Sequence, residues 1–132
     1  MAVNPVLPDS SFYIDCLQAG RDPLAALRLT AATRDLVVSP VVRCEVGRGI
    51  RNQKVLRRLH AAWDVMINVP TDARIWQDAE RTLWKMDREG RQIPLTDAVI
   101  ACSARRVAAT VLTRDKHFHW IEGIRVIESL ED

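Results

Sequence analysis

The 132-residue sequence has no long apolar run and only three cysteines. No stretch approaches the ~20 consecutive apolar residues that span a bilayer, and the first residues lack the basic and then apolar pattern of a secretory signal. Cys16, Cys44 and Cys102 are odd in number and show no Cys-x-x-Cys spacing, which argues against a disulfide framework or a structural zinc site. We therefore expect a cytoplasmic protein without membrane contact, whose cysteines are buried as small hydrophobic residues.

A strong excess of either charge is also lacking, because the formal net charge is only +2. With 48% apolar and 27% charged residues, the chain is expected to form one globular domain over residues 1–132. Basic charge is nevertheless concentrated in residues 48–60, where Arg48, Arg51, Lys54 and Arg58 recur at helical spacing and no acid is present. This stretch fits a solvated helix face, a nucleic-acid surface or a site for an acidic protein segment.

Short apolar segments alternate with amphipathic ones along the chain. Strands are expected at residues 4–7, 36–39, 65–70, 110–113 and 124–129, with helices between them. Such alternation predicts an α/β fold, a three-layer α/β/α sandwich around a central, mostly parallel five-stranded sheet.

Local signals mark the expected helix starts. Asp22-Pro23 and Ser39-Pro40 combine a capping residue with a proline of the first turn. Thr71 or Asp72 opens a long amphipathic helix that ends at Gly90, and Thr96 opens another after Pro94. Gly47 and Gly49 predict a break before the basic stretch. On the long helix one stripe is shared by Ile75, Ala79, Leu83 and Met86. Trp76, Trp84 and Leu83 fit either the core or an interface with a second copy, and the core is the preferred assignment.

Four acids border these apolar segments: Asp9, Glu45, Asp97 and Asp115. Asp9 and Asp115 follow the first and fourth expected strands. Asp97 lies in the first turn of its expected helix, and Glu45 lies in the second turn of its own. Parallel strands end at one edge, where the following helices begin, so all four are expected at that edge. Two carboxylates about 5 Å apart repel by roughly 3 kcal/mol at an effective dielectric near 20.

Four such carboxylates cannot all stay ionised at neutral pH unless a cation lies among them, so either some are protonated or a cation is bound. Carboxylate oxygens are ligands that suit Mg²⁺ or Mn²⁺. An ion of this kind works with substrate phosphates and can activate water. Taken singly, each acid is equally explained as a helix cap, a turn residue or a surface acid.

The segments around these acids resemble a known family. "PDSSFYIDCL", "SPVVRCEV", "LTDAVIACSARR" and "VLTRDKHF" occur in the order and spacing of the PIN-domain ribonucleases, and in particular of the VapC-type toxins of bacterial toxin–antitoxin pairs. The resemblance covers nearly the whole chain. It implies the strand order 3-2-1-4-5, with Asp9 beside Asp115, and metal ligation by Asp9, Glu45, Asp97 and Asp115. It also implies that the hydroxyls of Ser10 and Thr113 support the site.

Two residues depart from the family pattern. Pro8 stands where a strand residue is usual, and it removes one donor from the sheet. Ser10 replaces a commoner threonine, which is a conservative change. Asp15 is an additional acid, which is expected to face solvent.

The resemblance implies a metal-dependent endoribonuclease that hydrolyses RNA phosphodiester bonds with one or two Mg²⁺ or Mn²⁺ ions. It implies the toxin of a type II toxin–antitoxin system, with an antitoxin protein as partner and a homodimeric state. A non-catalytic PIN-like interaction module and a DNA-directed nuclease remain alternatives. A phosphoacceptor receiver domain is disfavoured, because neither the paired acids after its first strand nor the lysine after its last are visible. The residues expected to contact RNA are Arg48, Arg51, Lys54, Arg58, Arg114, Lys116 and His117.

Overall fold

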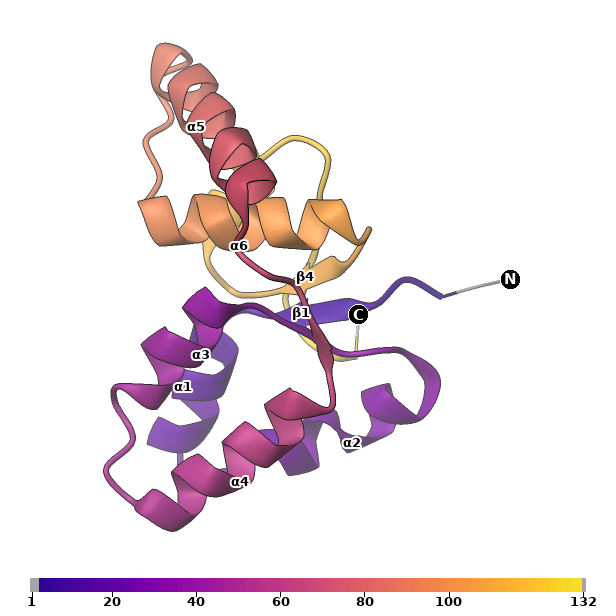
Figure 1. The fold of residues 1–132 in the computed structure, drawn as a ribbon. Coiled ribbons are helices and arrows are strands. Elements are labelled where there is room, and N and C mark those ends of the chain that lie inside the picture. The colour runs from indigo at the N-terminus through magenta and orange to yellow at the C-terminus, as the bar shows by residue number, and fades with distance from the viewer. Residues whose placement is uncertain (1–2, 132) are drawn as a thin grey trace.

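The computed structural model describes residues 3–131, in which short strands alternate with helices (Figure 1). Met1, Ala2 and Asp132, the ends of the predicted domain, lie outside the described residues. The elements are β1 (Val6–Pro8), α1 (Ser10–Gln18), α2 (Pro23–Thr33), β2 (Val37–Val38), α3 (Pro40–Gly47), α4 (Gln53–Asp64), β3 (Ile67–Asn68), α5 (Ala73–Arg88), α6 (Leu95–Arg106), β4 (Thr110–Leu112), the 3₁₀ helix η1 (Lys116–Trp120) and β5 (Arg125–Ile127).

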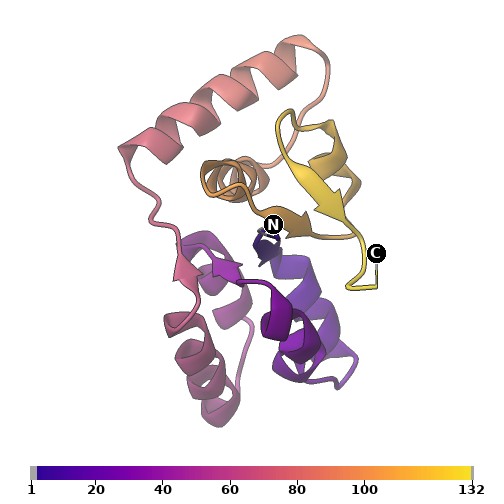
Figure 2. The ribbon, with the colours of Figure 1, turned by 90° about the vertical axis from the view of Figure 1, so that its right-hand side faces the viewer.

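The strands lie in the middle of the molecule, with helices on both sides. Helices α5 and α6 cover one side, and α1, α2, α3 and α4 lie on the other (Figures 1 and 2). Every strand pairing is parallel. The predicted α/β class and its parallel pairing are therefore confirmed.

The five strands form two sheets instead of the one continuous sheet predicted. One has the order β1-β4-β5 and the other pairs β2 with β3. Within residues 3–131, a parallel bridge between Val6 and Leu36 connects them. Read across that bridge, the order is β3-β2-β1-β4-β5, and the strands are shorter than the sequence suggests.

Pro8 explains the division. On the β2 side, the Val6 N–H donates to the Asp35 carbonyl oxygen at 2.9 Å. On the β4 side, the Asp9 N–H donates to the Leu112 carbonyl oxygen at 2.9 Å. Since N–H groups alternate in direction along a strand, residue 8 faces β2 again. Proline has no N–H to donate there, so the ladder that begins at Val6 cannot continue.

Side-chain caps set most of the predicted helix starts. Asp22 accepts a hydrogen bond from Leu24 N at 3.0 Å, and Ser39 accepts from Val42 N at 3.4 Å, each just before a proline of the first turn. Asp72 caps α5 through Ile75 N at 3.2 Å. The predicted break after Gly47 is confirmed, because α3 ends there.

Helix α6 differs, since it begins at Leu95 and not at Thr96. Pro94 takes the N-cap position without a side-chain hydrogen bond. Its φ of −62° and ψ of 147° give the extended backbone of an N-cap residue, but its side chain offers no acceptor to the first N–H groups of the helix. The residues from Ala98 to Ala104 are all buried, which makes α6 the central helix of the molecule.

Some predicted core residues are exposed. Trp76 and Trp84 are 44% and 62% exposed, because α5 packs on α6 with its other stripe, which includes Ile75, Ala79 and Met86. Cys16 and Cys102 are buried, but Cys44 is exposed, because it lies off the α3 face that carries Val42 and Val46. Asp15 faces solvent as expected. Over the described range no helix has the length and apolarity required to cross a membrane.

Candidate metal centre

The four acids come from elements that meet at the carboxyl ends of β1 and β4. Asp9 follows β1 and caps α1, and Asp115 lies beyond β4 and caps η1. Because β1 and β4 are parallel neighbours, with Pro8 opposite Leu112, the two acids lie at the same edge. Asp97 occupies the first turn of α6 and Glu45 lies on α3. Partial positive charge at the N-terminus of α6 favours the Asp97 carboxylate, whereas Glu45 lies in the second turn of α3, beyond this effect.

Asp9 is 4% exposed and is held by several donors. The hydroxyls of Thr113 and Ser11 donate to its Oδ2, each at 3.0 Å, and Ser10 N–H donates to its Oδ1 at 2.7 Å. Burial nevertheless raises the pKa of Asp9, and the nearby charge of Glu45 adds to that rise. The Asp9 side chain is therefore fixed in place, although its environment disfavours the charged carboxylate.

Ser10 and Thr113 connect these acids to one another. Ser10 Oγ donates to Glu45 Oε1 at 2.6 Å, which joins α1 to α3. Thr113, which is buried, donates to Asp9 and accepts from Asp115 N–H at 3.0 Å. The Ser10 and Thr113 hydroxyls thus each donate to one of the four acids.

Asp97 shows the strain of the cluster most clearly. Burial, together with the charges of Asp115 and Asp9, raises its pKa to about 7. Within the described chain its buried Oδ2 atom has no aligned hydrogen-bond partner. A buried carboxylate oxygen with two acids nearby and no donor is the environment that a cation would stabilise.

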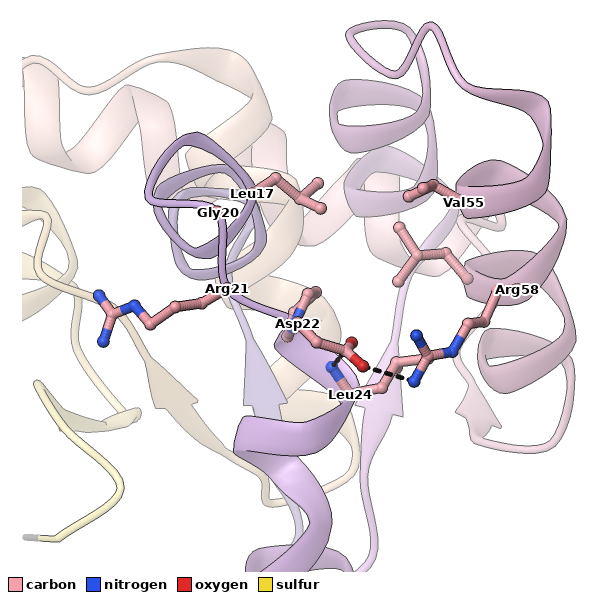
Figure 3. A pocket seen from close by; sticks show the side chains of 9 residues that line it. Leu17, Gly20, Arg21, Asp22, Leu24, Val55 and Arg58 are labelled. Carbon is pink, nitrogen blue, oxygen red and sulfur yellow. Dashed lines mark hydrogen bonds and ion pairs between the residues drawn. The ribbon is translucent and has the colours of Figure 1, made fainter.

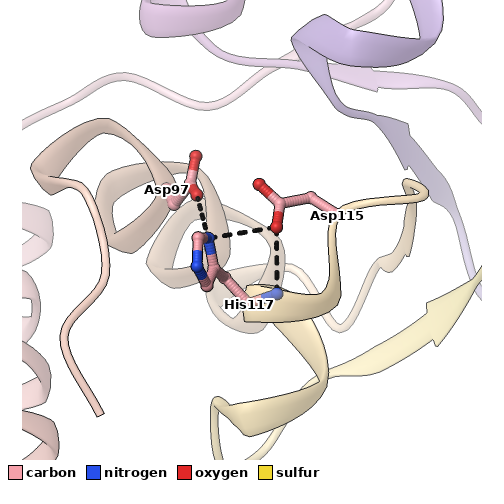
Figure 4. Close-up of side chains that lie close together, drawn as sticks. All are labelled: Asp97, Asp115 and His117. Atoms are coloured by element: carbon pink, nitrogen blue, oxygen red, sulfur yellow. Dashed lines mark hydrogen bonds and ion pairs between the residues drawn. The ribbon is translucent and has the colours of Figure 1, made fainter.

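His117 lies among these acids (Figure 4). Its Nδ1 atom is 3.1 Å from Asp115 Oδ1 and 3.7 Å from Asp97 Oδ2. One ligand atom from each of these three residues lies within 4.8 Å of the others. Sequence reasoning assigned His117 to RNA contact. Its position depends on η1, which turns back because Asp115 Oδ1 accepts from His117 N–H at 2.9 Å.

A groove of about 390 Å³ opens beside Glu45, between α3 and the starts of α5 and α6. Arg48 and the exposed ring of Trp76 line it together with Glu45. Of the other predicted RNA contacts, Arg51, Lys54, Arg114 and Lys116 are exposed. Arg58 is instead paired with Asp22, away from the acids.

That pair borders a second hollow, of about 270 Å³, at the carboxyl end of α1 (Figure 3). Leu17, Leu24 and Val55 give it apolar walls from α1, α2 and α4. It lies at the opposite end of α1 from Asp9, and so it is distinct from the acid cluster.

Comparisons with known proteins agree with this arrangement. The PIN domain family model matches residues 6–123, whereas a comparison with curated proteins gave no significant match. VapBC2 from Rickettsia felis, solved with a DNA fragment of its promoter, has a TM-score of 0.77 at 16% identity, over 92% of this chain and 96% of that chain.

DNA-bound VapBC from Salmonella typhimurium has a TM-score of 0.77 at 17% identity, over 95% of this chain and 98% of that chain. VapC20 from Mycobacterium tuberculosis, described as a Sarcin-Ricin loop cleaving toxin, has a TM-score of 0.64 at 15% identity, over 91% of this chain and 98% of that chain. At these identities the solved structures establish a shared fold.

Proposed function

Since this chain belongs to the PIN-domain family, we propose that it is a metal-dependent endoribonuclease that hydrolyses RNA phosphodiester bonds. We also propose that it is the cytoplasmic toxin of a type II toxin–antitoxin pair. One observation carries the nuclease proposal: the acids that follow β1 and β4 and the acids on α3 and α6 converge at one edge of the sheet. Those acids, the proposed metal ligands, are Asp9, Glu45, Asp97 and Asp115.

The donor set fits Mg²⁺ or Mn²⁺. Carboxylate oxygens are the ligands that these ions prefer, and the buried Asp97 Oδ2 lacks a donor among residues 3–131. A bound divalent ion supplies Lewis acidity for water activation and for charge on the phosphate, and one or two ions could be held.

The chain's own residues would orient the ligands and the substrate. Thr113 fixes Asp9 relative to Asp115, and Ser10 fixes Glu45 on the adjoining helix. In the groove beside Glu45, Arg48 offers a phosphate contact and Trp76 offers a ring for base stacking. Exposed Arg114 and Lys116, on either side of Asp115, add positive charge close to the acids.

An antitoxin partner and a homodimer belong to the same proposal. Solved neighbours include VapBC assemblies from two organisms. The apolar hollow in Figure 3 is separate from the acids, so a partner segment could dock there. The exposed ring of Trp84 on α5 offers apolar surface for a second copy.

The test is cleavage of total cellular RNA by the purified protein with Mg²⁺ or Mn²⁺, with EDTA, and by Asp97→Asn. Asp15→Asn is the matched control, because that acid faces solvent on α1. Fragments that require metal, persist with Asp15→Asn and disappear with Asp97→Asn would support the proposal. Cleavage of DNA but not RNA would favour the DNA-directed nuclease. Neither cleavage nor metal binding would favour the non-catalytic interaction module.

A further inference from the structure

We propose that His117 is itself a metal ligand, so that one imidazole nitrogen joins the carboxylates of Asp97 and Asp115 around the ion. The mixed donor set would give the site a preference for Mn²⁺ over Mg²⁺. This inference rests on the proposed metal site and is independent of which nucleic acid is cut.

The separations of the three ligand atoms suit a shared ion. Nδ1 of His117 lies 3.1 Å from Asp115 Oδ1 and 3.7 Å from Asp97 Oδ2. Ligands about 2.1 Å from an octahedral ion stand about 3.0 Å apart when adjacent and about 4.2 Å apart when opposite. The observed separations of 3.1 and 3.7 Å lie within that range.

A simple ion pair between His117 and the acids explains the geometry less well. Although Nδ1 is close to two carboxylate oxygens, it is buried and forms no aligned hydrogen bond with any residue from 3 to 131. Asp97 Oδ2, its neighbour at 3.7 Å, is buried and unpartnered in the same sense. His117 Nδ1 and Asp97 Oδ2 thus point toward each other without a hydrogen bond between them, an arrangement that suits two ligands of one ion (Figure 4).

The imidazole ring is held in this orientation by its surroundings. The backbone N–H of His117 donates to Asp115 Oδ1, which ties the start of η1 to that acid. The ring packs edge-on against Trp120, with a centroid separation of 5.0 Å and an interplanar angle of 62°. The next residue, Phe118, is fully buried and anchors the turn in the core. Little rearrangement would therefore precede binding.

The predicted selectivity follows from donor chemistry. Mg²⁺ strongly prefers oxygen ligands, whereas first-row transition ions also accept imidazole nitrogen. A nitrogen in the ligand set therefore adds affinity for Mn²⁺ without adding comparable affinity for Mg²⁺.

The experiment is pulsed electron paramagnetic resonance of Mn²⁺ bound to the purified full chain in the absence of RNA. Electron spin echo modulation from a directly bound ¹⁴N nucleus is expected in the wild type and should be lost in His117→Asn. His119→Asn is the matched control. His119 lies on the same turn, is 47% exposed and pairs with Glu128 at 3.4 Å, outside the three-ligand cluster.

Calorimetric titrations with Mn²⁺ and with Mg²⁺ provide the second readout. His117→Asn should weaken Mn²⁺ binding about tenfold or more, the scale on which even outer partners of a metal matter, and should weaken Mg²⁺ binding much less. Wild-type protein that binds Mn²⁺ without ¹⁴N modulation, or equal losses for both ions, would overturn the inference. Metal-dependent RNA cleavage without ¹⁴N modulation would overturn the inference alone. ¹⁴N modulation without cleavage would overturn the nuclease alone.

Discussion

Replacing Asp97 by asparagine should make the metal-free protein more stable at neutral and alkaline pH. Burial and two neighbouring acids raise the pKa of Asp97 to about 7, from an ordinary 3.8. Between these values the folded protein binds a proton that the unfolded chain has released, so the free energy of unfolding falls as pH rises. Asparagine carries no such charge, and its amide can donate to Asp115 as the protonated acid does.

The expected magnitude follows from the difference in pKa. About three units at about 1.4 kcal/mol each give about 4 kcal/mol as an upper value, reached above pH 7. Residual solvation of a side chain that is 13% exposed lowers this figure, so a gain of about 2 to 4 kcal/mol is expected at pH 8. The advantage of Asp97→Asn should disappear towards pH 4, where the wild-type carboxyl is protonated in both states.

Urea unfolding with EDTA, followed from pH 4 to pH 8, measures this difference directly. Asp15→Asn serves as the control, because its exposed carboxylate should give a difference that does not vary with pH. When a metal ion is added at a hundred times its dissociation constant, the free energy of unfolding of the wild type should rise by about 2.7 kcal/mol. The same addition should raise the free energy of unfolding of Asp97→Asn very little. A difference between wild type and Asp97→Asn that is constant with pH, or a variant less stable at pH 8, would refute the reasoning.

Three further predictions concern neighbouring features. Thr113→Val should lower the free energy of unfolding by about 1 to 3 kcal/mol in urea, because buried Asp9 loses a donor; an unchanged midpoint would contradict this. Pro8→Val should create an amide that donates to the Val37 carbonyl and is protected in hydrogen exchange, whereas rapid exchange would reject our account of the divided sheet. Trp84→Arg should convert a dimer to a monomer by light scattering at fixed concentration, and a monomeric wild type would disprove the interface.

The position of the acids could be predicted because it depends on simple rules. Asp9 and Asp115 follow strands directly, and parallel strands bring such residues to one edge. Asp97 lies in the first turn of α6 and Glu45 in the second turn of α3, and both helices begin at that edge. Strand–helix order was therefore sufficient to place the four acids at one edge, whereas the adjacency of Asp9 and Asp115, 106 positions apart, was implied by the family resemblance.

The features that the sequence analysis missed depend on local geometry. His117 reaches Asp97 only because η1 turns back beneath its Asp115 cap, and such a short turn leaves no periodic signal. For Trp76 and Trp84 a signal was present, since at about 100° per residue they lie about 100° and about 180° around the helix from Ile75. Both therefore lie off the stripe that Ile75 shares with Ala79 and Met86. The division of the sheet also had a signal in the sequence, because Pro8 has no N–H to donate. The sequence does not show which neighbouring strand that position faces, so the place of the division could not be predicted.

The hydrogen bond between Thr113 and Asp9 spans 104 residues, and this has a consequence during translation. At about 5 to 20 residues per second, the ribosome makes Asp115 roughly 5 to 20 seconds after Asp9. A nascent chain that stops just before Asp115 already contains β4 but lacks a ligand of the proposed centre. The nuclease proposed here would thus be inactive while most of it is being synthesised, and its assembly would coincide with the last stage of translation.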